Sequence, residues 1–262
     1  MKHFLNGILC LLILAPIAGA QAPGAASQPP PTKVDPKAAA PVKQAEAATV
    51  GLPTPANDLR TGKYAYQVTV EVNGQTFDLK VNTVITDGGS SWTATNTMET
   101  PQGTGTDTTT IDKGSLILRK RSVLQGPLLI DLDFAGDKAT GKIDMNGEVH
   151  QVASDLGGPL FGDGAGGDQV LACLPLAVGY STTFRNFDVE AQKVKLMQLS
   201  VPSVEAVTVP AGKFEAYRVE IAPSDGGDKK TLWIAKDSHK VVKGSAVVAS
   251  MGGAALTQEL TE

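Results

Sequence analysis

Residues 64–81, YAYQVTVEVNGQTFDLKV, decide the fold class of this chain. Apolar and polar side chains alternate on both sides of Asn73-Gly74. Such alternation is typical of a half-buried β-strand, and Asn-Gly is the strongest short signal for a two-residue hairpin turn. The register that this turn predicts places apolar side chains opposite one another on one face: Val70 with Phe77, Val68 with Leu79, and Tyr66 with Val81. Because turn chemistry and pattern agree, the sequence predicts a hairpin here.

Similar alternating segments continue to the end of the chain, separated by turns rich in glycine and aspartate. We count roughly a dozen strands, whose short connections predict a mainly antiparallel sheet. The apolar run 169–178 is the best helix candidate; Asp168 is its expected N-cap, and Pro175 limits its length. The run is apolar nearly all round, so we expect it to be buried against the sheet. The predicted fold class is mainly β, a curved antiparallel sheet or half-open barrel with one short internal helix, with a sandwich as the alternative.

Two local features of the strands depart from the simple alternating pattern. Asn146-Gly147 marks a second hairpin, but its simple register places Val149 opposite Asp144. Either this loop is longer than two residues or the pair is weakly buried. In the segment 194–201 the apolar phase slips between Leu196 and Met197, which predicts a β-bulge at that point.

The N-terminal part predicts export. Residues 1–20 have the form of a cleavable signal peptide, with a positive start, an apolar core from Leu5 to Ile17 and small residues at 18–20. That core is shorter than a membrane span, so the alternative of an uncleaved anchor is disfavoured and no transmembrane span is expected after cleavage. Residues 21–56 are rich in proline and alanine and predict a disordered linker, followed by a single β-rich domain at 57–262. The expected location is the periplasm of a Gram-negative-type envelope, or the exterior.

Charge and cysteine content exclude several classes of protein. The formal net charge is −4, and no cluster of lysine and arginine suggests a phosphate track, so no nucleic-acid partner is expected. The densest basic run, Arg119-Lys120-Arg121, is interpreted as a solvated strand end. Once a leader is removed only Cys173 remains, so no internal disulfide can form. Cys173 lies in an apolar run and is expected to be a small buried side chain.

No motif predicts catalysis or a cofactor. The sequence has no G-x-S-x-G elbow, and consecutive residues such as Ser238-His239 point in divergent directions. Asp131 and Asp133 share one strand face, which is more typical of a solvated surface than of a glycosidase pair. Metal ligands with zinc spacing are absent, and the single glycine-aspartate stretch at 162–168 resembles one copy of a calcium repeat that acts only in arrays. We therefore expect a non-enzymatic protein with no catalytic residues, no metal and no cofactor.

The glycine-rich segment 155–168 interrupts the strand pattern just before the helix candidate. A sheet curved around one apolar helix can leave an apolar cavity, and this segment would lie beside it. We therefore expect the segment and the start of the helix to form a gate for a hydrophobic ligand. The candidate gate residues are Phe161, Asp163, Asp168, Leu171 and Leu174.

The C-terminal third resembles a large family of uncharacterised bacterial envelope proteins, a domain of unknown function. The run 209–220, VPAGKFEAYRVE, carries the resemblance together with 231–238, TLWIAKDS, and 174–180, LPLAVGY. This family is similar in architecture to lipoprotein carriers of the LolA and LolB type, which implies a half-open barrel and a cavity for acyl chains or other hydrophobic ligands. The resemblance implies no individual ligand-binding residue.

Three functions follow as hypotheses. The first is a non-enzymatic envelope protein that binds a lipid or another hydrophobic small molecule. The second is a scaffold or accessory module that binds an envelope protein partner. The third, and the least favoured, is a carboxylate-dependent hydrolase.

Overall fold

The computed structural model describes residues 50–100 and 103–262; the predicted signal peptide and the linker up to residue 49 lie outside the described residues. The described chain forms one antiparallel sheet of fourteen strands with one short α-helix, α1 (Gly167–Ala172). The predicted fold class, a mainly β curved sheet with one internal helix, is confirmed. The sheet stays open and does not close into a barrel.

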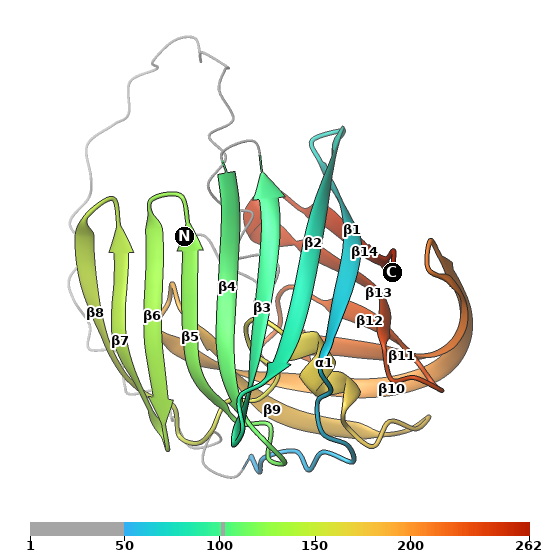
Figure 1. The fold of residues 1–262 in the computed structure, drawn as a ribbon, viewed down its shortest axis with the longest axis horizontal. Coiled ribbons are helices and arrows are strands. Elements are labelled where there is room, and N and C mark those ends of the chain that lie inside the picture. The colour runs from blue at the N-terminus through green and yellow to red at the C-terminus, as the bar shows by residue number, and fades with distance from the viewer. Residues whose placement is uncertain (1–49, 101–102) are drawn as a thin grey trace, which may run out of the picture.

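The first eight strands form a meander that we call the first wall (Figure 1). Each strand pairs with the next one along the chain. These strands are β1 (Gly62–Val72), β2 (Gln75–Asp87), β3 (Ser91–Thr100), β4 (Gly103–Asp112), β5 (Leu118–Gln125), β6 (Leu128–Ala135), β7 (Lys138–Met145) and β8 (Glu148–Asp155).

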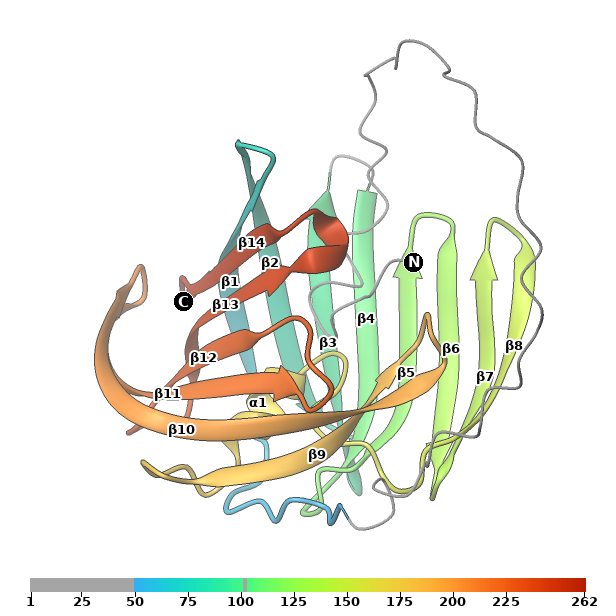
Figure 2. The ribbon, with the colours of Figure 1, turned by 180° about the vertical axis from the view of Figure 1, so that it is seen from behind.

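The remaining six strands form a second meander, the second wall, which follows α1 in the chain. Its β10 is the longest strand and runs across the whole wall (Figure 2). The strands are β9 (Ser181–Asp188), β10 (Lys193–Val209), β11 (Gly212–Pro223), β12 (Lys230–Ala235), β13 (Val241–Val248) and β14 (Ala254–Leu260), with a 3-10 turn, η3 (Ala249–Met251), between the last two.

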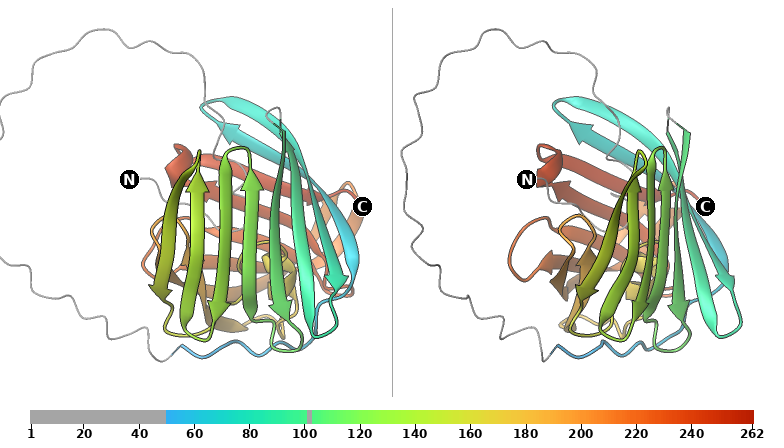
Figure 3. Two further views of the ribbon diagram at one scale, coloured as in Figure 1. Left: turned by 60° about the vertical axis from the view of Figure 1, so that its left-hand side comes forward. Right: turned by 90° about the vertical axis from the view of Figure 1, so that its left-hand side faces the viewer.

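The last strand joins the two walls. β14 pairs with both β13 and β1, so the sheet runs from β8 at one edge through β1 and β14 to β9 at the other. Twisted sheets of more than about ten strands curl, because each strand is rotated relative to its neighbour. Here the second wall folds across the first, and α1 lies between the two (Figures 1 and 3).

The hydrophobic core fills the space between the walls. It contains aromatic side chains from the segment before α1 and from β6 and β9, and their rings meet edge to face, Phe161 with Phe184 and Phe134 with Phe187. Such pairs contribute about 0.5–1.5 kcal/mol beyond the area that they bury. One of these contacts therefore joins the segment before α1 to the second wall, and the other joins the two walls to each other.

The hairpin that decided the fold has the predicted register. Tyr66 pairs with Val81, and the other predicted pairs follow up to the turn. Asn73 and Gly74 both have positive φ, 52° and 75°, as a type I′ turn requires. The sequence prediction is confirmed residue by residue.

The predictions for the second hairpin and for the bulge have different outcomes. The Asn146-Gly147 turn has the simple register, so Val149 lies opposite Asp144, and the side chain of Val149 is 49% exposed. The loop is therefore short and the pair weakly buried. The bulge prediction was wrong in position: the pairing of β10 with β11 shifts between Ser200 and Ser203, and Met197 pairs regularly. The buried side chains before and after the bulge keep the same alternation along β10, so the apolar pattern does not reveal its position.

The helix prediction needs a correction at its start. The N-cap position is Gly166, with φ of 70°, and no side chain caps the helix. Asp168 instead lies in the first turn, where its carboxylate binds groups of the second wall. The helix ends at Ala172, three residues before Pro175, as expected for a residue that cannot donate a backbone hydrogen bond.

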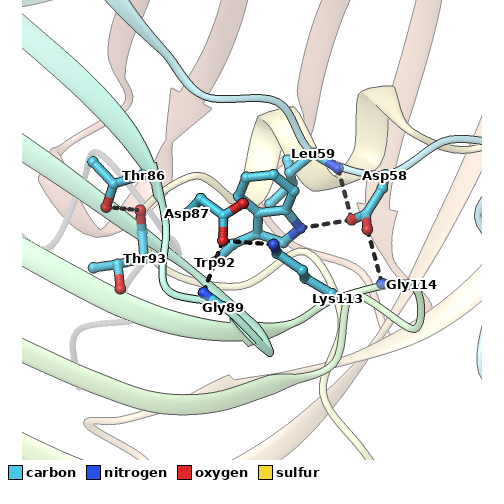
Figure 4. A network of polar contacts seen from close by, with 9 residues as sticks. All are labelled: Asp58, Leu59, Thr86, Asp87, Gly89, Trp92, Thr93, Lys113 and Gly114. Carbon is cyan, nitrogen blue, oxygen red and sulfur yellow. Dashed lines mark hydrogen bonds and ion pairs between the residues drawn. The ribbon is translucent and has the colours of Figure 1, made fainter.

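The segment before β1, residues 50–61, is hydrogen-bonded to the rest of the domain. Residues 50–56, which the sequence assigns to the linker, contact the domain: the backbone N–H of Ala56 donates to the carbonyl of Cys173 at 2.8 Å. Next to it, Asp58 accepts hydrogen bonds from Trp92 Nε1 at 2.7 Å and from the backbone of Gly114 at 3.1 Å (Figure 4). Lys113 covers the Trp92 ring at 4.5 Å from its centroid. This network joins the segment to β3 and to the turn between β4 and β5 of the first wall.

Candidate functional site

A cleft of about 500 Å³ lies between the loop before α1 and strands β9, β10 and β11. Small-molecule sites typically have volumes of about 300–1,000 Å³ and mainly apolar walls. The apolar lining combines buried side chains with partly exposed ones: Leu171, Phe184 and Ile221 are buried, and Val194, Met197 and Pro223 are partly exposed. The cleft can therefore hold the hydrocarbon part of a ligand.

The charges around the cleft are largely paired. Lys195 Nζ lies 2.7 Å from Asp188 Oδ2, and Lys230 Nζ lies 2.5 Å from Asp168 Oδ1. Asp188 also accepts a backbone hydrogen bond from the turn that follows β9, which fixes its carboxylate. A third lysine, Lys193, lies at the start of β10 and is exposed. The cleft thus presents an apolar lining between two internal ion pairs.

A second, much smaller space lies next to the cleft. It is a void of about 20 Å³ that shares Gly164, Asp168 and Lys230 with the cleft as common lining residues. The hydroxyl of Tyr66 contributes to its lining and donates to a backbone carbonyl of the second wall at 3.0 Å. Burial raises the pKa of the Tyr66 hydroxyl, so the group stays protonated and keeps this hydrogen bond. The void is therefore polar, unlike the cleft.

The loop before α1, which contributes to the lining of both spaces, is held by a buried ion cluster. Arg121 of β5 binds Asp107 of β4 through two hydrogen bonds, at 2.9 and 3.2 Å, and lies 3.4 Å from Asp163 of the loop. Asp163 also accepts from the backbone N–H of Phe187 at 2.8 Å. The side chain of Arg121 is 1% exposed, so its interpretation as part of a solvated strand end was wrong. The side-chain period alone could not show this, because the pairing of β4 with β5 shifts just before Arg121.

Burial is also the main influence on the two carboxyls of this cluster. It raises the pKa of Asp107 and of Asp163, although the guanidinium of Arg121 opposes the change. One cation between two buried carboxylates leaves an excess negative charge in a low-dielectric environment, which favours proton uptake. The cluster anchors the loop, and both carboxylates are engaged by Arg121.

The five predicted gate residues lie in two places. Asp168 and Leu171 line the cleft, while Phe161, Asp163 and Leu174 are buried beside it. Their role as a gate stays a prediction. The sequence analysis did not identify the cleft residues of β9–β12, because only the topology of the sheet brings these strands beside α1. The alternation of apolar side chains in these strands shows which residues point inward, but it does not show that they line a cleft.

The other candidate residues of the sequence have ordinary structural contacts. Asp131 and Asp133 are exposed on the outer face, where Lys120 lies 3.1 and 3.9 Å away, which confirms the solvated surface. The ring nitrogen Nδ1 of His239 lies 3.1 Å from the carbonyl oxygen of Ala172. Cys173 is buried, and burial raises the pKa of its thiol to about 12.

The described residues offer neither a cluster of metal ligands nor a membrane-spanning helix. Within 50–100 and 103–262, no group of three or more histidine, cysteine or acidic side chains is placed to hold a metal ion. In the same part of the chain, no helix has the length and apolar character needed to cross a bilayer. The predictions that the protein has no cofactor and no enzymatic activity stay predictions.

Comparisons with known proteins place the chain in a family. A solved structure that resembles it is described as a putative exported protein with a YmcC-like fold from Bacteroides fragilis. The two chains are 10% identical, the alignment covers 80% of this chain and 98% of the other, and the TM-score is 0.32. No curated protein matches. A family model described as "Protein of unknown function (DUF3108)" matches residues 63–260. The chain therefore belongs to the DUF3108 family.

Proposed function

We propose that this protein is a non-enzymatic envelope protein that binds the hydrocarbon part of a lipid or another hydrophobic small molecule. The observation that carries the proposal is the cleft of about 500 Å³ beside α1, with its mainly apolar lining. Each methylene group moved from water into such a lining contributes about 0.8 kcal/mol. An alkyl chain of moderate length would therefore bind without a strong polar contact.

The position of the cleft supports a binding role. Its lining comes from β9, β10, β11 and the loop before α1, and that loop is held by the buried ion cluster around Arg121. A lining whose side chains are already fixed loses little conformational entropy when a ligand enters. The predicted signal peptide, residues 1–20, supports export and hence an envelope location.

Native mass spectrometry tests the proposal on the mature chain purified from a bacterial periplasm. We expect a co-purified mass that organic extraction removes, or a shift when fatty alcohol or phospholipid is added. Met197→Glu places a charge in the cleft and is expected to abolish binding. Gln198→Glu is the matched control, because Gln198 is the exposed neighbour on the opposite face of β10.

Three results would contradict the proposal. The first is a wild-type protein that carries no ligand and shows no shift with either additive. The second is equal binding by the Met197 variant and the wild type. The third is loss of binding in the Gln198 control together with the Met197 variant, provided that circular dichroism shows both to be folded.

A partner-binding scaffold is the second candidate. The observation that favours it is the free edge of the sheet at β8, a strand that pairs with β7 alone and is mostly exposed. Such edges can pair with a strand of another protein. A photo-crosslinking residue at Gln151 in β8 would then capture an envelope protein, whereas one at Gln198 would not. Equal capture from both positions, or none from Gln151, would contradict this candidate.

A further inference from the structure

The side chain of Gln258 in β14 has an unusual place for an amide. Gln258 is 6% exposed and lines the small void next to the cleft. Its Nε2 donates to Asp168 Oδ2 at 3.2 Å, and because a carboxylate only accepts, this contact fixes the orientation of the amide. Its Oε1 is buried and has no donor among the described residues. A buried acceptor without a donor costs about 1–3 kcal/mol.

The neighbouring strand leaves room for this amide. Gly244 of β13 is paired with Gln258, and a Cβ atom added to Gly244 would lie 2.6 Å from Gln258 Nε2 and 2.8 Å from its Cγ. Both distances are below normal contact, and both atoms lie within a buried side chain, so a larger residue would displace the amide. The packing of β13 against β14 thus holds Gln258 in the position from which it faces the void.

The groups around the void include one buried acceptor without a donor, Gln258 Oε1. Four of the side chains that line it already donate to acceptors of the protein: Lys230 binds Asp168, Tyr66 binds the carbonyl of Val241, Thr83 binds Asn96, and Gln169 binds the Tyr66 oxygen. A void of about 20 Å³ holds one group of the size of a water molecule, since roughly 10–15 Å³ suffices for one. The group that suits this place must carry a proton to donate.

We propose that this void is the polar end of the cleft and takes a hydroxyl, or another small uncharged hydrogen-bond donor, at the end of an apolar ligand. The void and the cleft share Asp168 and Lys230, so a chain in the cleft can reach it at that ion pair. A carboxylate or phosphate would bring a negative charge next to Asp168 and no proton for Gln258 Oε1. The ligand class is therefore an alcohol-type amphiphile. This inference rests on the proposed binding of a hydrophobic ligand in the cleft.

Displacement of a fluorescent apolar probe, 1-aminoanthracene, from the mature chain tests the inference. The competitors share one alkyl chain and differ at its end: decan-1-ol carries a donor, 1-chlorodecane has a small end group without one, and decanoate carries a charge. We expect decan-1-ol to bind about tenfold more tightly than either of the others, the effect of one buried hydrogen bond. These three measurements use the wild-type protein and need no variant to fold.

Two variants connect the preference to the amide. Gln258→Leu removes the acceptor at similar volume and is expected to abolish the preference for decan-1-ol while 1-chlorodecane still binds. Gln198→Leu, the same change on the outer face of β10, is expected to keep the preference. Equal binding of the three competitors by the wild type, or tightest binding of decanoate, would overturn the subsite and leave the proposed function intact. Failure of the probe and of all competitors to bind would overturn both.

Discussion

Replacement of Arg121 with methionine is expected to lower the free energy of unfolding by about 3–5 kcal/mol at neutral pH. The change removes the cation that lies against two carboxylates, those of Asp107 and Asp163, whose side chains are 0% and 1% exposed. Removal of one partner from a buried ion pair typically costs about 3–5 kcal/mol, because it leaves an uncompensated charge. Domains of this kind have a total stability of about 5–15 kcal/mol, so the loss is a large fraction.

The loss should depend on pH in a defined direction. Without the guanidinium, the two carboxyls can avoid a buried charge by taking up protons on folding. The free energy of protonating each carboxyl becomes more favourable by about 1.4 kcal/mol for each unit by which the pH falls. The deficit of Arg121→Met relative to the wild type should therefore shrink from about pH 7 to about pH 5. Urea unfolding followed by the fluorescence of Trp92 and Trp233 measures the free energy at both pH values.

A neighbouring arginine provides the control. Arg119 binds Asp112 through two hydrogen bonds at 2.7 and 2.5 Å, but its side chain is 41% exposed. Surface ion pairs contribute about 0–1 kcal/mol, so Arg119→Met should be nearly neutral. The reasoning would be refuted if Arg121→Met cost less than about 1 kcal/mol, or if its deficit were the same at both pH values.

Three further predictions concern single side chains. The thiol of Cys173, whose pKa burial raises to about 12, should react with iodoacetamide at about pH 8 only after urea unfolds the protein; rapid labelling of the native state would contradict its burial. Asp58→Ala removes the acceptor of three hydrogen bonds and should cost about 1–2 kcal/mol and speed proteolysis before β1; an unchanged melting curve would contradict this. Asp163→Asn removes a carboxyl whose pKa burial raises. The ionised form is disfavoured in the folded state, so the wild type should lose stability relative to this variant as the pH rises from about 4 to about 7; the opposite trend in urea titrations would show a lowered pKa.

The sequence predicted the features that local chemistry determines. Asn73-Gly74 sets both the turn and the register of β1 and β2, because only residues that tolerate positive φ suit a type I′ turn. The resemblance to a bacterial family of unknown function is confirmed by the family match over residues 63–260. The likeness to LolA and LolB carriers stays a prediction.

The sequence could not predict contacts that depend on which strands meet. Arg121 follows an irregularity in the pairing of β4 with β5, and its partner Asp163 lies 42 residues away in the chain. Gln258 and Asp168 are 90 residues apart and meet only because β14 returns to pair with β1. In an alternating strand, a glutamine or an arginine predicts a solvent-facing position. Only the tertiary hydrogen-bond partners of Arg121 and Gln258 show that these two side chains point inward.

Two carboxylates hold the segment around the start of α1, residues 161–168, between the walls, the buried Asp163 and the partly exposed Asp168. Asp163 binds Arg121 of the first wall, and Asp168 binds Lys230 and Gln258 of the second. Movement of this segment away from the first wall would break a buried ion pair, whose loss costs several kcal/mol, and movement away from the second wall would break the partly exposed pair of Asp168 with Lys230. The turns at 189–192 and 224–229 border the cleft, and the first of them is joined to β8 of the first wall by a hydrogen bond from Ser154 Oγ to the carbonyl oxygen of Gln192 at 3.4 Å, which is weaker than a buried ion pair. We therefore expect a ligand to enter and leave past these turns, while the segment around α1 stays in place and fixes the depth and the polar end of the cleft.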